Sequence, residues 1–181
     1  AAPAGADWSA ESPIPTALEI RGVAVPADGH IFLATEDDSF DDGGALFEST
    51  DGGVTWVQRG VPEGGFSDFH GVFFLHADHG WAWGNENHRT TDGGATWEAL
   101  PLLGSTYGMR FFSPDFGVAT GNGGAYVSRD GGLTWEESPE EMRAFSFQGE
   151  VGLGAADSGL HRTTDGGDTF APVRAGEAAA V

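Results

Sequence analysis

The stretch Ser49-Thr50-Asp51-Gly52-Gly53-Val54-Thr55-Trp56 occurs four times in this chain of 181 residues, in closely similar forms. The other copies are Thr90–Trp97, Ser128–Trp135 and Thr163–Phe170. Successive aspartates of the four copies are 41, 38 and 35 residues apart. A repeat of this length predicts an array of similar supersecondary units.

Each copy predicts a tight hairpin turn. Asp-Gly-Gly between two β-rich runs favours a hairpin, because glycine adopts positive φ at low cost. The aspartate can accept hydrogen bonds from turn amides, and the flanking hydroxyl groups can add side-chain to backbone bonds. The aromatic ring that ends each copy is predicted to pack one sheet against the next. The structural residues assigned in this way are Asp51, Trp56, Asp92, Trp97, Asp130, Trp135, Asp165 and Phe170.

The repeated pattern S/T-x-D-x-G-x-T-W/F resembles the Asp box, or bacterial neuraminidase repeat, which lies between the two outer strands of β-propeller blades. The resemblance implies one all-β propeller or partial propeller over residues 1–181, with about four blades of four antiparallel strands. The blades are expected at about 17–62, 66–101, 106–139 and 142–173. Short runs of β-branched and aromatic residues between turn signals favour an all-β fold as well.

An extra N-terminal strand is predicted around Trp8, because Trp8–Pro13 imitates the residues that follow the later repeats, such as Trp97–Pro101. The last repeat already carries its own outer strand at Phe170–Val173, so one strand is left over. The four blades could close alone, belong to a larger ring, or pair as a homodimer by strand exchange. We favour a monomeric ring or partial ring.

The charge of the chain limits its partners. Acidic residues number 28 and basic residues 8, which gives a formal net charge of −20 and argues against nucleic-acid binding. No apolar run is long enough to predict a transmembrane segment. The absence of cysteine excludes disulfide and thiolate chemistry. The start Ala-Ala-Pro-Ala resembles a mature end after signal-peptide removal, which predicts a secreted or periplasmic protein.

A column of basic residues follows from aligning the predicted first strands, with Met109–Ser113 as the first strand of the third blade. The column contains Arg21, His70, Arg110 and Arg143. At three of these positions, an Asp or Glu lies two residues earlier in the sequence. Side chains two residues apart in a strand lie on the same face, so each acid lies on the same face as its basic residue. One interpretation is local ion pairing that makes each cation tolerable. The other is a cationic patch that binds an acidic peptide or a carboxylate terminus.

An acidic loop precedes the first repeat. Its carboxylates at Asp37, Asp38, Asp41 and Asp42 are candidate calcium ligands, since calcium prefers hard oxygen ligands. The spacing does not match an EF-hand, and acidic runs of this kind are usually solvated. No other metal or cofactor is predicted.

The first blade resembles the opening of sialidases, with Arg21-Gly22-Val23 at the position of the R-I-P motif. However, Asp38 stands where that family has its second arginine. The resemblance implies a tyrosine nucleophile, yet Tyr107 and Tyr126 both lie in the third blade, outside the position expected for it. A sialidase-related glycoside-binding protein or glycosidase is therefore the alternative hypothesis.

The segments Phe73–Gly84 and Phe111–Gly121 resemble the blades of photosystem II assembly and stability factors, a family with an arginine patch used in binding a partner protein. This resemblance implies a non-enzymatic, exported propeller that binds another protein through one face. We take a protein-binding or assembly scaffold as the leading hypothesis.

Overall fold

The computed structural model describes residues 18–36, 44–59, 68–101, 104–122, 124–138 and 142–173, except for the side chain of Arg143. These residues form four antiparallel sheets of four strands each. The predicted all-β fold of four four-stranded units is confirmed. The strand predicted around Trp8 lies outside the described residues. Within the described ranges, no helix is long and apolar enough to cross a membrane.

Each sheet consists of four consecutive strands in chain order. The first sheet contains β1 (Glu19–Ala27), β2 (His30–Glu36), β3 (Leu46–Ser49) and β4 (Val57–Arg59). The second contains β5 (Phe69–Phe74), β6 (Gly80–Gly84), β7 (Asn87–Thr90) and β8 (Glu98–Leu100). The third contains β9 (Thr106–Phe111), β10 (Gly117–Gly121), β11 (Gly124–Ser128) and β12 (Glu136–Glu137). The fourth contains β13 (Met142–Gln148), β14 (Val151–Ala156), β15 (Gly159–Thr163) and β16 (Ala171–Pro172).

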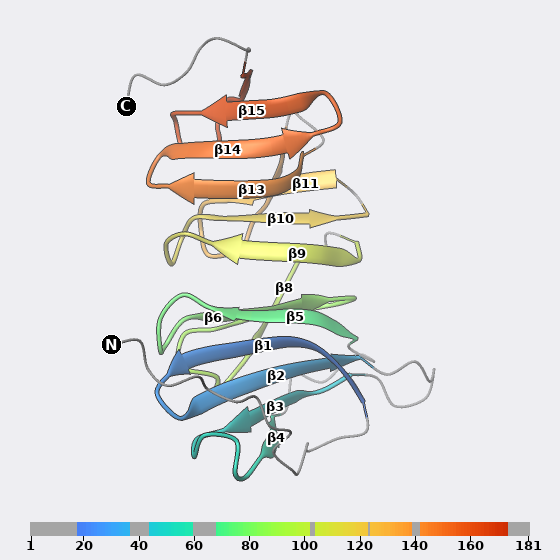
Figure 1. Ribbon diagram of the computed structural model, residues 1–181, viewed down its shortest axis with the longest axis vertical. Coiled ribbons are helices and arrows are strands. Elements are labelled where there is room, and N and C mark those ends of the chain that lie inside the picture. Colours follow the sequence, from blue (N-terminus) through green and yellow to red (C-terminus); the bar gives the residue numbers. More distant parts are fainter. Residues whose placement is uncertain are drawn as a thin grey trace, which may run out of the picture.

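The sheets follow one another along the long axis of the molecule, with the first sheet at one end and the fourth at the other (Figure 1). In the two end sheets, β1 and β13 lie nearest the middle, and the remaining strands extend from them in opposite directions. β1 packs against β5, and β5 packs against β9, so first strands of neighbouring sheets meet at an inner edge. The described residues therefore form an open arc of blades.

The repeated turns are held by the same set of hydrogen bonds in all four sheets. In the first turn, the Ser49 hydroxyl donates to Asp51 Oδ1 at 2.8 Å and accepts from the Gly53 amide at 2.8 Å. The amide and the hydroxyl of Thr55 donate to the Asp51 carboxylate at 2.8 and 2.6 Å. Gly52 and Gly53 have φ angles of 75° and 92°, which glycine adopts without a Cβ clash. The same contacts occur in the other three turns.

These hydrogen bonds favour the ionised carboxylates. The Thr55 hydroxyl, the Thr55 amide and the Ser49 hydroxyl together lower the pKa of Asp51 to about 2. The pKa values of Asp92 and Asp130 are lowered mainly by the hydroxyls of the threonines four residues later. The pKa of Asp165 is lowered mainly by the Thr163 hydroxyl. Each turn is therefore a charged, hydrogen-bonded unit at neutral pH.

The aromatic ring of each repeat lies on the face of its sheet that points toward the preceding sheet. Trp97 packs edge-on against Phe32 of the first sheet, with ring centroids 6.1 Å apart. Trp135 packs against the cluster that contains Trp81 of the second sheet. Trp56 of the first sheet packs on Leu33 and the rest of a separate cluster, on the face turned away from the second sheet.

One column of residues covers the opposite face. Each member lies on the second strand of its sheet, opposite the residue that comes just before the Ser or Thr of the repeat. The members are Phe32, Trp81, Val118 and Leu153. We call this set the forward column. Phe32 stacks on Phe74 of the second sheet at 4.6 Å, and Trp81 stacks on Phe111 of the third sheet at 3.8 Å. In the first and second sheets, the forward column thus supplies ring contacts to the following sheet.

Candidate functional site

Every first strand contains a β-bulge near its beginning. The pairing register with the second strand shifts between Ile20 and Gly22, between Phe69 and Gly71, opposite the Thr120–Gly121 step, and between Met142 and Ala144. A bulged residue is left out of the ladder, and bulges commonly redirect a side chain at a functional edge. The bulged residues, which we call the bulge row, are Arg21, His70, Tyr107 and Arg143.

The bulge row differs from the predicted basic column at one position. In the third sheet Tyr107 is level with Arg21 and His70, whereas Arg110 lies three residues further along and pairs with Val118. The reason is that β9 begins at Thr106, earlier than the predicted strand at Met109. The alignment that placed Arg110 in the column was therefore wrong, although Arg110 lies on the same strand.

Arg21 is held by two carboxylates. Its Nη2 lies 3.1 Å from Glu19 Oε2, and its Nε lies 2.5 Å from Glu36 Oε2. The Arg21 side chain is 39% exposed, so these ion pairs are partly screened by solvent. Local ion pairing is thus the interpretation that fits Arg21.

His70 and Tyr107 join the second and third sheets. His70 Nδ1 donates to the carbonyl oxygen of Thr106 at 2.7 Å. The rings of His70 and Tyr107 are stacked at 6.2 Å with an interplanar angle of 24°. Tyr107 is 59% exposed, and its hydroxyl contacts Asn122 Oδ1. This part of the bulge row offers an exposed aromatic surface with polar groups at its margin.

Polar side chains continue this edge beside the bulge row. Asn85 Nδ2 donates to Asp68 Oδ2 at 3.1 Å, and the Ser105 hydroxyl donates to Asn85 Oδ1 at 3.3 Å. Amide and hydroxyl groups of this kind can both donate and accept. The inner edge can therefore form hydrogen bonds with a peptide backbone through neutral groups. It does not need a cluster of positive charges to do so.

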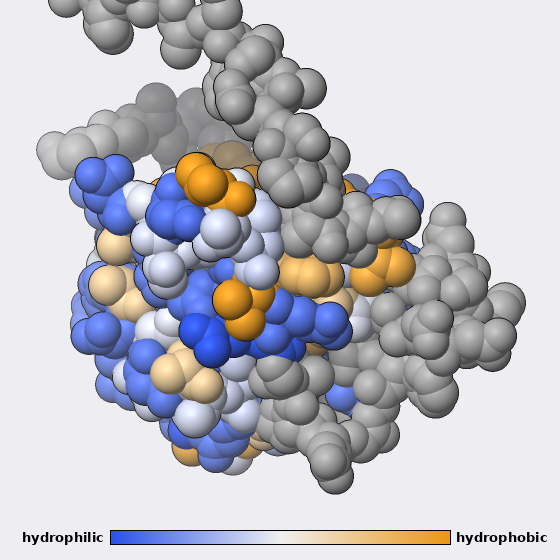
Figure 2. Space-filling view, turned by 90° about the horizontal axis from the view of Figure 1, so that it is seen from below, coloured by the Kyte–Doolittle hydropathy of each residue, from blue (hydrophilic) through white to orange (hydrophobic). Residues whose placement is uncertain are grey.

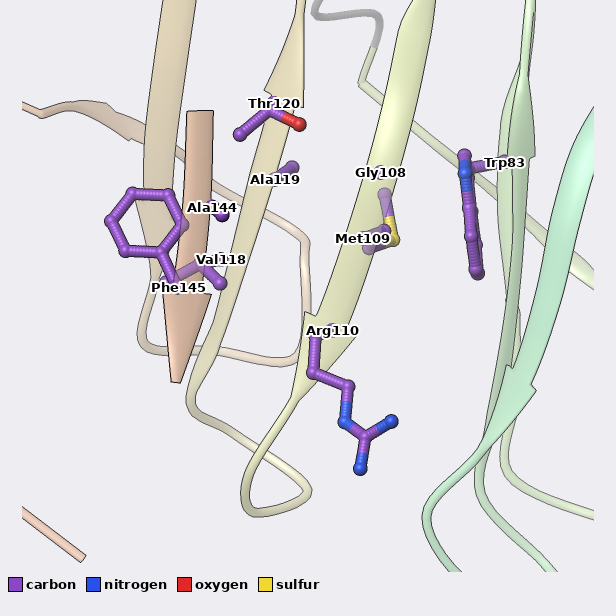
Figure 3. A pocket seen from close by; sticks show the side chains of 9 residues that line it. All are labelled: Trp83, Gly108, Met109, Arg110, Val118, Ala119, Thr120, Ala144 and Phe145. Carbon is purple, nitrogen blue, oxygen red and sulfur yellow. The ribbon is translucent and has the colours of Figure 1, made fainter. Parts of the chain in front are cut away.

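A cleft of about 270 Å³ lies next to the bulge row (Figure 3). In Figure 3, Val118, Ala144 and Phe145 lie on one side of β9, and Trp83 lies on the other. The cleft is lined by Trp83, Gly108, Met109, Arg110, Val118, Ala119, Thr120, Ala144 and Phe145. Its walls are mainly apolar, with Arg110 as the charged residue.

Arg110 is exposed, and its guanidinium carbon lies 4.4 Å from the centre of the Phe73 ring. Such stacking supports the cation on one side and leaves its N–H groups able to bind an anion. No ion pair to Arg110 occurs within the part of the chain that the structure describes. Arg143 lies in β13, but its side chain and Glu141 are outside the described set.

The candidate calcium ligands Asp37, Asp38, Asp41 and Asp42 also lie outside the described residues. Among those that are described, no group of three or more His, Asp or Glu side chains could hold a metal ion. The calcium site remains a prediction from the sequence. The site that the described residues do form is the bulge row together with the cleft.

A family model for the BNR/Asp-box repeat matches residues 126–137. The chain is 25% identical over 130 residues to the chloroplast photosystem II stability/assembly factor HCF136 of Oryza sativa subsp. japonica. That match covers 66% of this chain and 31% of the rice protein, so this chain spans about a third of the length of its relative. The resemblance to Asp-box propellers of the photosystem II assembly-factor type is confirmed.

Two solved structures share the fold. YCF48 bound to a D1 peptide has a TM-score of 0.59 and 24% identity, over 87% of this chain and 55% of that one. An ancestral GH74 enzyme has a TM-score of 0.62 and 15% identity, over 88% of this chain and 24% of that one. At these identities, the likeness shows the architecture alone.

Proposed function

We propose that this chain is a non-enzymatic, exported scaffold that binds an extended segment of a partner protein along its inner edge. A relative by sequence is a stability/assembly factor, and a protein of the same fold is solved with a peptide bound. Both findings support a protein-binding role for this chain. Export forms part of the proposal, and fractionation of the native cells with a specific antibody tests it.

The observation that carries the proposal is an apolar cleft placed directly beside a polar edge. Gly108, which lines the cleft, follows Tyr107 of the bulge row, and Ala144 follows Arg143. A cleft of about 270 Å³ is below the usual size of a small-molecule site, roughly 300–1,000 Å³. It suits one or two apolar side chains of a peptide whose backbone meets the bulge row.

The charge of the chain restricts that peptide. The net charge of −20 repels a strongly acidic partner at long range. Arg110 nevertheless offers a local site for one carboxylate at the cleft. The proposed ligand is therefore an extended segment with an apolar side chain, a neighbouring carboxylate, and no large excess of negative charge.

A glycosidase is the weaker proposal, because no contact of the described residues favours it. Arg21, the residue that would receive a substrate carboxylate in a sialidase-like site, already contacts Glu19 and Glu36. We expect no turnover of a fluorogenic sialoside by the purified chain. Turnover that disappears in an Arg21→Ala variant would replace the scaffold proposal.

Fluorescence anisotropy with labelled synthetic peptides tests the scaffold. The panel holds an extended peptide with one Leu next to one Asp, a version with Asn for Asp, and a version with Ser for Leu. We expect the first peptide to bind and the other two to bind at least about tenfold more weakly, because each loses one anchor. Val118→Trp and Arg110→Ala should weaken binding, whereas Arg162→Ala should not, because Arg162 is exposed and lies outside the cleft. Equal affinities for all three peptides would reject the cleft as the binding site.

A further inference from the structure

The cleft passes around the free edge of β9. Gly108, Met109 and Arg110 are consecutive residues of β9, and all three line the cleft. Consecutive side chains of a strand point to opposite faces of its sheet, so the cleft reaches both faces of β9. Figure 3 shows the same arrangement, with Phe145 on one side of β9 and Trp83 on the other. A cleft that reaches both faces of a sheet runs past its edge, and β9 is the edge strand of the third sheet.

The main-chain groups along this edge can accept partners from outside their sheet. In the part of the chain that the structure describes, β9 pairs only with β10. Every second residue of such an edge strand directs its N–H and C=O groups away from its own sheet. The carbonyl oxygen of Thr106 in β9 is one of these groups, because it accepts a hydrogen bond from the His70 side chain of the second sheet. The backbone of an extended peptide could pair with the others in the same direction.

The backbone of β9 is also more accessible than that of β1. A Cβ added to Gly22 of β1 would lie 2.8 Å from the Cα of Gly71 in β5, so the backbone of β5 covers β1 at that point. Gly108 holds the same position in β9, directly after the bulged residue. Among the described residues outside its own neighbours, a Cβ added to Gly108 would meet only the Thr120 hydroxyl within 4 Å, at 3.2 Å. A peptide backbone can therefore approach β9 where the same approach to β1 is blocked.

The two anchors of the cleft lie on opposite sides of β9. The apolar wall at Val118 and Phe145 lies on the side of the fourth sheet (Figure 3). The Arg110 guanidinium lies on the other side, because it stacks on the Phe73 ring of the second sheet. Seen from the first-sheet end, by contrast, the apolar areas of the surface are separated by hydrophilic ones (Figure 2). The cleft thus combines an apolar anchor and a cationic anchor across a single strand.

From this arrangement we infer that the partner segment binds as an additional β-strand along the free edge of β9. The inference rests on the proposed function and gives its mode of recognition. Main-chain hydrogen bonds to β9 hold the segment, and its alternating side chains select it. Neighbouring side chains of an added strand point to opposite sides, so one enters the apolar wall and the next reaches Arg110. A leucine directly beside an aspartate therefore fits both anchors, whereas the same two residues separated by one position do not.

The spacing of the two anchor residues in the peptide tests the inference. The reference is the labelled synthetic peptide with one Leu next to one Asp, measured by fluorescence anisotropy with the 181-residue chain. One Ser inserted between Leu and Asp should weaken binding at least about tenfold, because both side chains then point to the same side of the added strand. The same Ser inserted outside the pair is the matched control, and it should change the affinity by less than about twofold. Equal affinities for the two inserted peptides would overturn the inference.

N-methylation of the reference peptide, one residue at a time, gives an independent readout. A methyl group removes the amide hydrogen, and only every second amide of an added strand faces β9. We expect binding to weaken at least about tenfold at alternate positions and by less than about threefold at the positions between them. A profile without this alternation would overturn the inference and leave the proposed function standing. Failure of the reference peptide itself to bind would instead reject the proposed function, and the inference with it.

Discussion

The junction between the first and second sheets is tight, whereas the junction between the third and fourth sheets is open. In the first, Phe32 is fully buried and stacks on Phe74 at 4.6 Å. The inner strands also approach closely, because a Cβ added at Gly22 would lie 2.8 Å from the Cα of Gly71. At the junction between the third and fourth sheets, Phe145 and Phe147 are only half-buried, and the cleft lies between β9 and β13.

The difference follows from one position of the forward column. The first and second sheets place Phe32 and Trp81 there, whereas the third sheet places Val118. A valine cannot fill the volume that an aromatic ring occupies, so the space beside it stays open. A repeated fold can therefore open a cleft by reducing the size of one side chain, without changing the order of its strands.

The largest effect is expected from removing a ring at the tight junction. Phe32→Ala should lower the free energy of unfolding by about 3–5 kcal/mol, because it leaves a cavity in a fully buried cluster. Phe147→Ala should cost less, since Phe147 is only half-buried. Urea unfolding followed by tryptophan fluorescence measures both values. A larger loss for Phe147→Ala would invert the comparison between the two junctions.

A smaller effect of opposite sign is expected from filling the cleft. Val118→Phe should raise the free energy of unfolding by about 1 kcal/mol, as cavity-filling changes commonly do. It should also weaken peptide binding, because the added ring occupies the apolar wall. Val57→Phe is the control, since Val57 is 57% exposed in the first sheet. Stabilisation with unchanged peptide affinity would separate the cleft from the binding site.

The smallest effect is expected from protonating the aspartates of the repeated turns, which have the same contacts at both junctions. The folded-state pKa of Asp51 is about 2, below its ordinary value of 3.8, so the unfolded chain binds more protons between these values. The stabilisation is therefore complete above about pH 4 and is lost as the pH falls toward 2. Urea unfolding at a series of pH values should show the same decrease in the free energy of unfolding with falling pH in Phe32→Ala and Phe147→Ala, because the four turns are unchanged in both variants. A different pH dependence of the free energy of unfolding in the two variants would mean that the turns contribute unequally.

Much of the architecture could be predicted because it depends on a repeated local signal. Four Asp-Gly-Gly turns at blade spacing specify four hairpins, and strand periodicity supplies the rest of each sheet. The openness of the arc could not be predicted in this way, because hairpin signals carry no information on the angle between sheets. The structure shows which sheet faces are covered: Phe32 is fully buried, whereas Leu153 at the same position of the fourth sheet is 41% exposed.

The candidate site was predicted in part. Arg21 and His70 lie in the bulge row, but Tyr107 was missed in favour of Arg110. All four first strands contain the bulge at the same place, so it does not disturb their alignment. The error came from starting the third first strand at Met109 instead of Thr106. The cleft was missed as well. Comparing side-chain size along the forward column, where Val118 replaces a ring, would have indicated it.

Trp97 and Trp135 each pack on the sheet before their own, so contacts between neighbouring sheets hold the arc together. A molecule coupled in this way has a graded resistance to heating, like other one-dimensional arrays. The fourth sheet, attached at the loosest junction, is the unit that detaches first. Heating would then leave a three-sheet remnant, and amide exchange in β13–β15 would run ahead of exchange in β1 and β2.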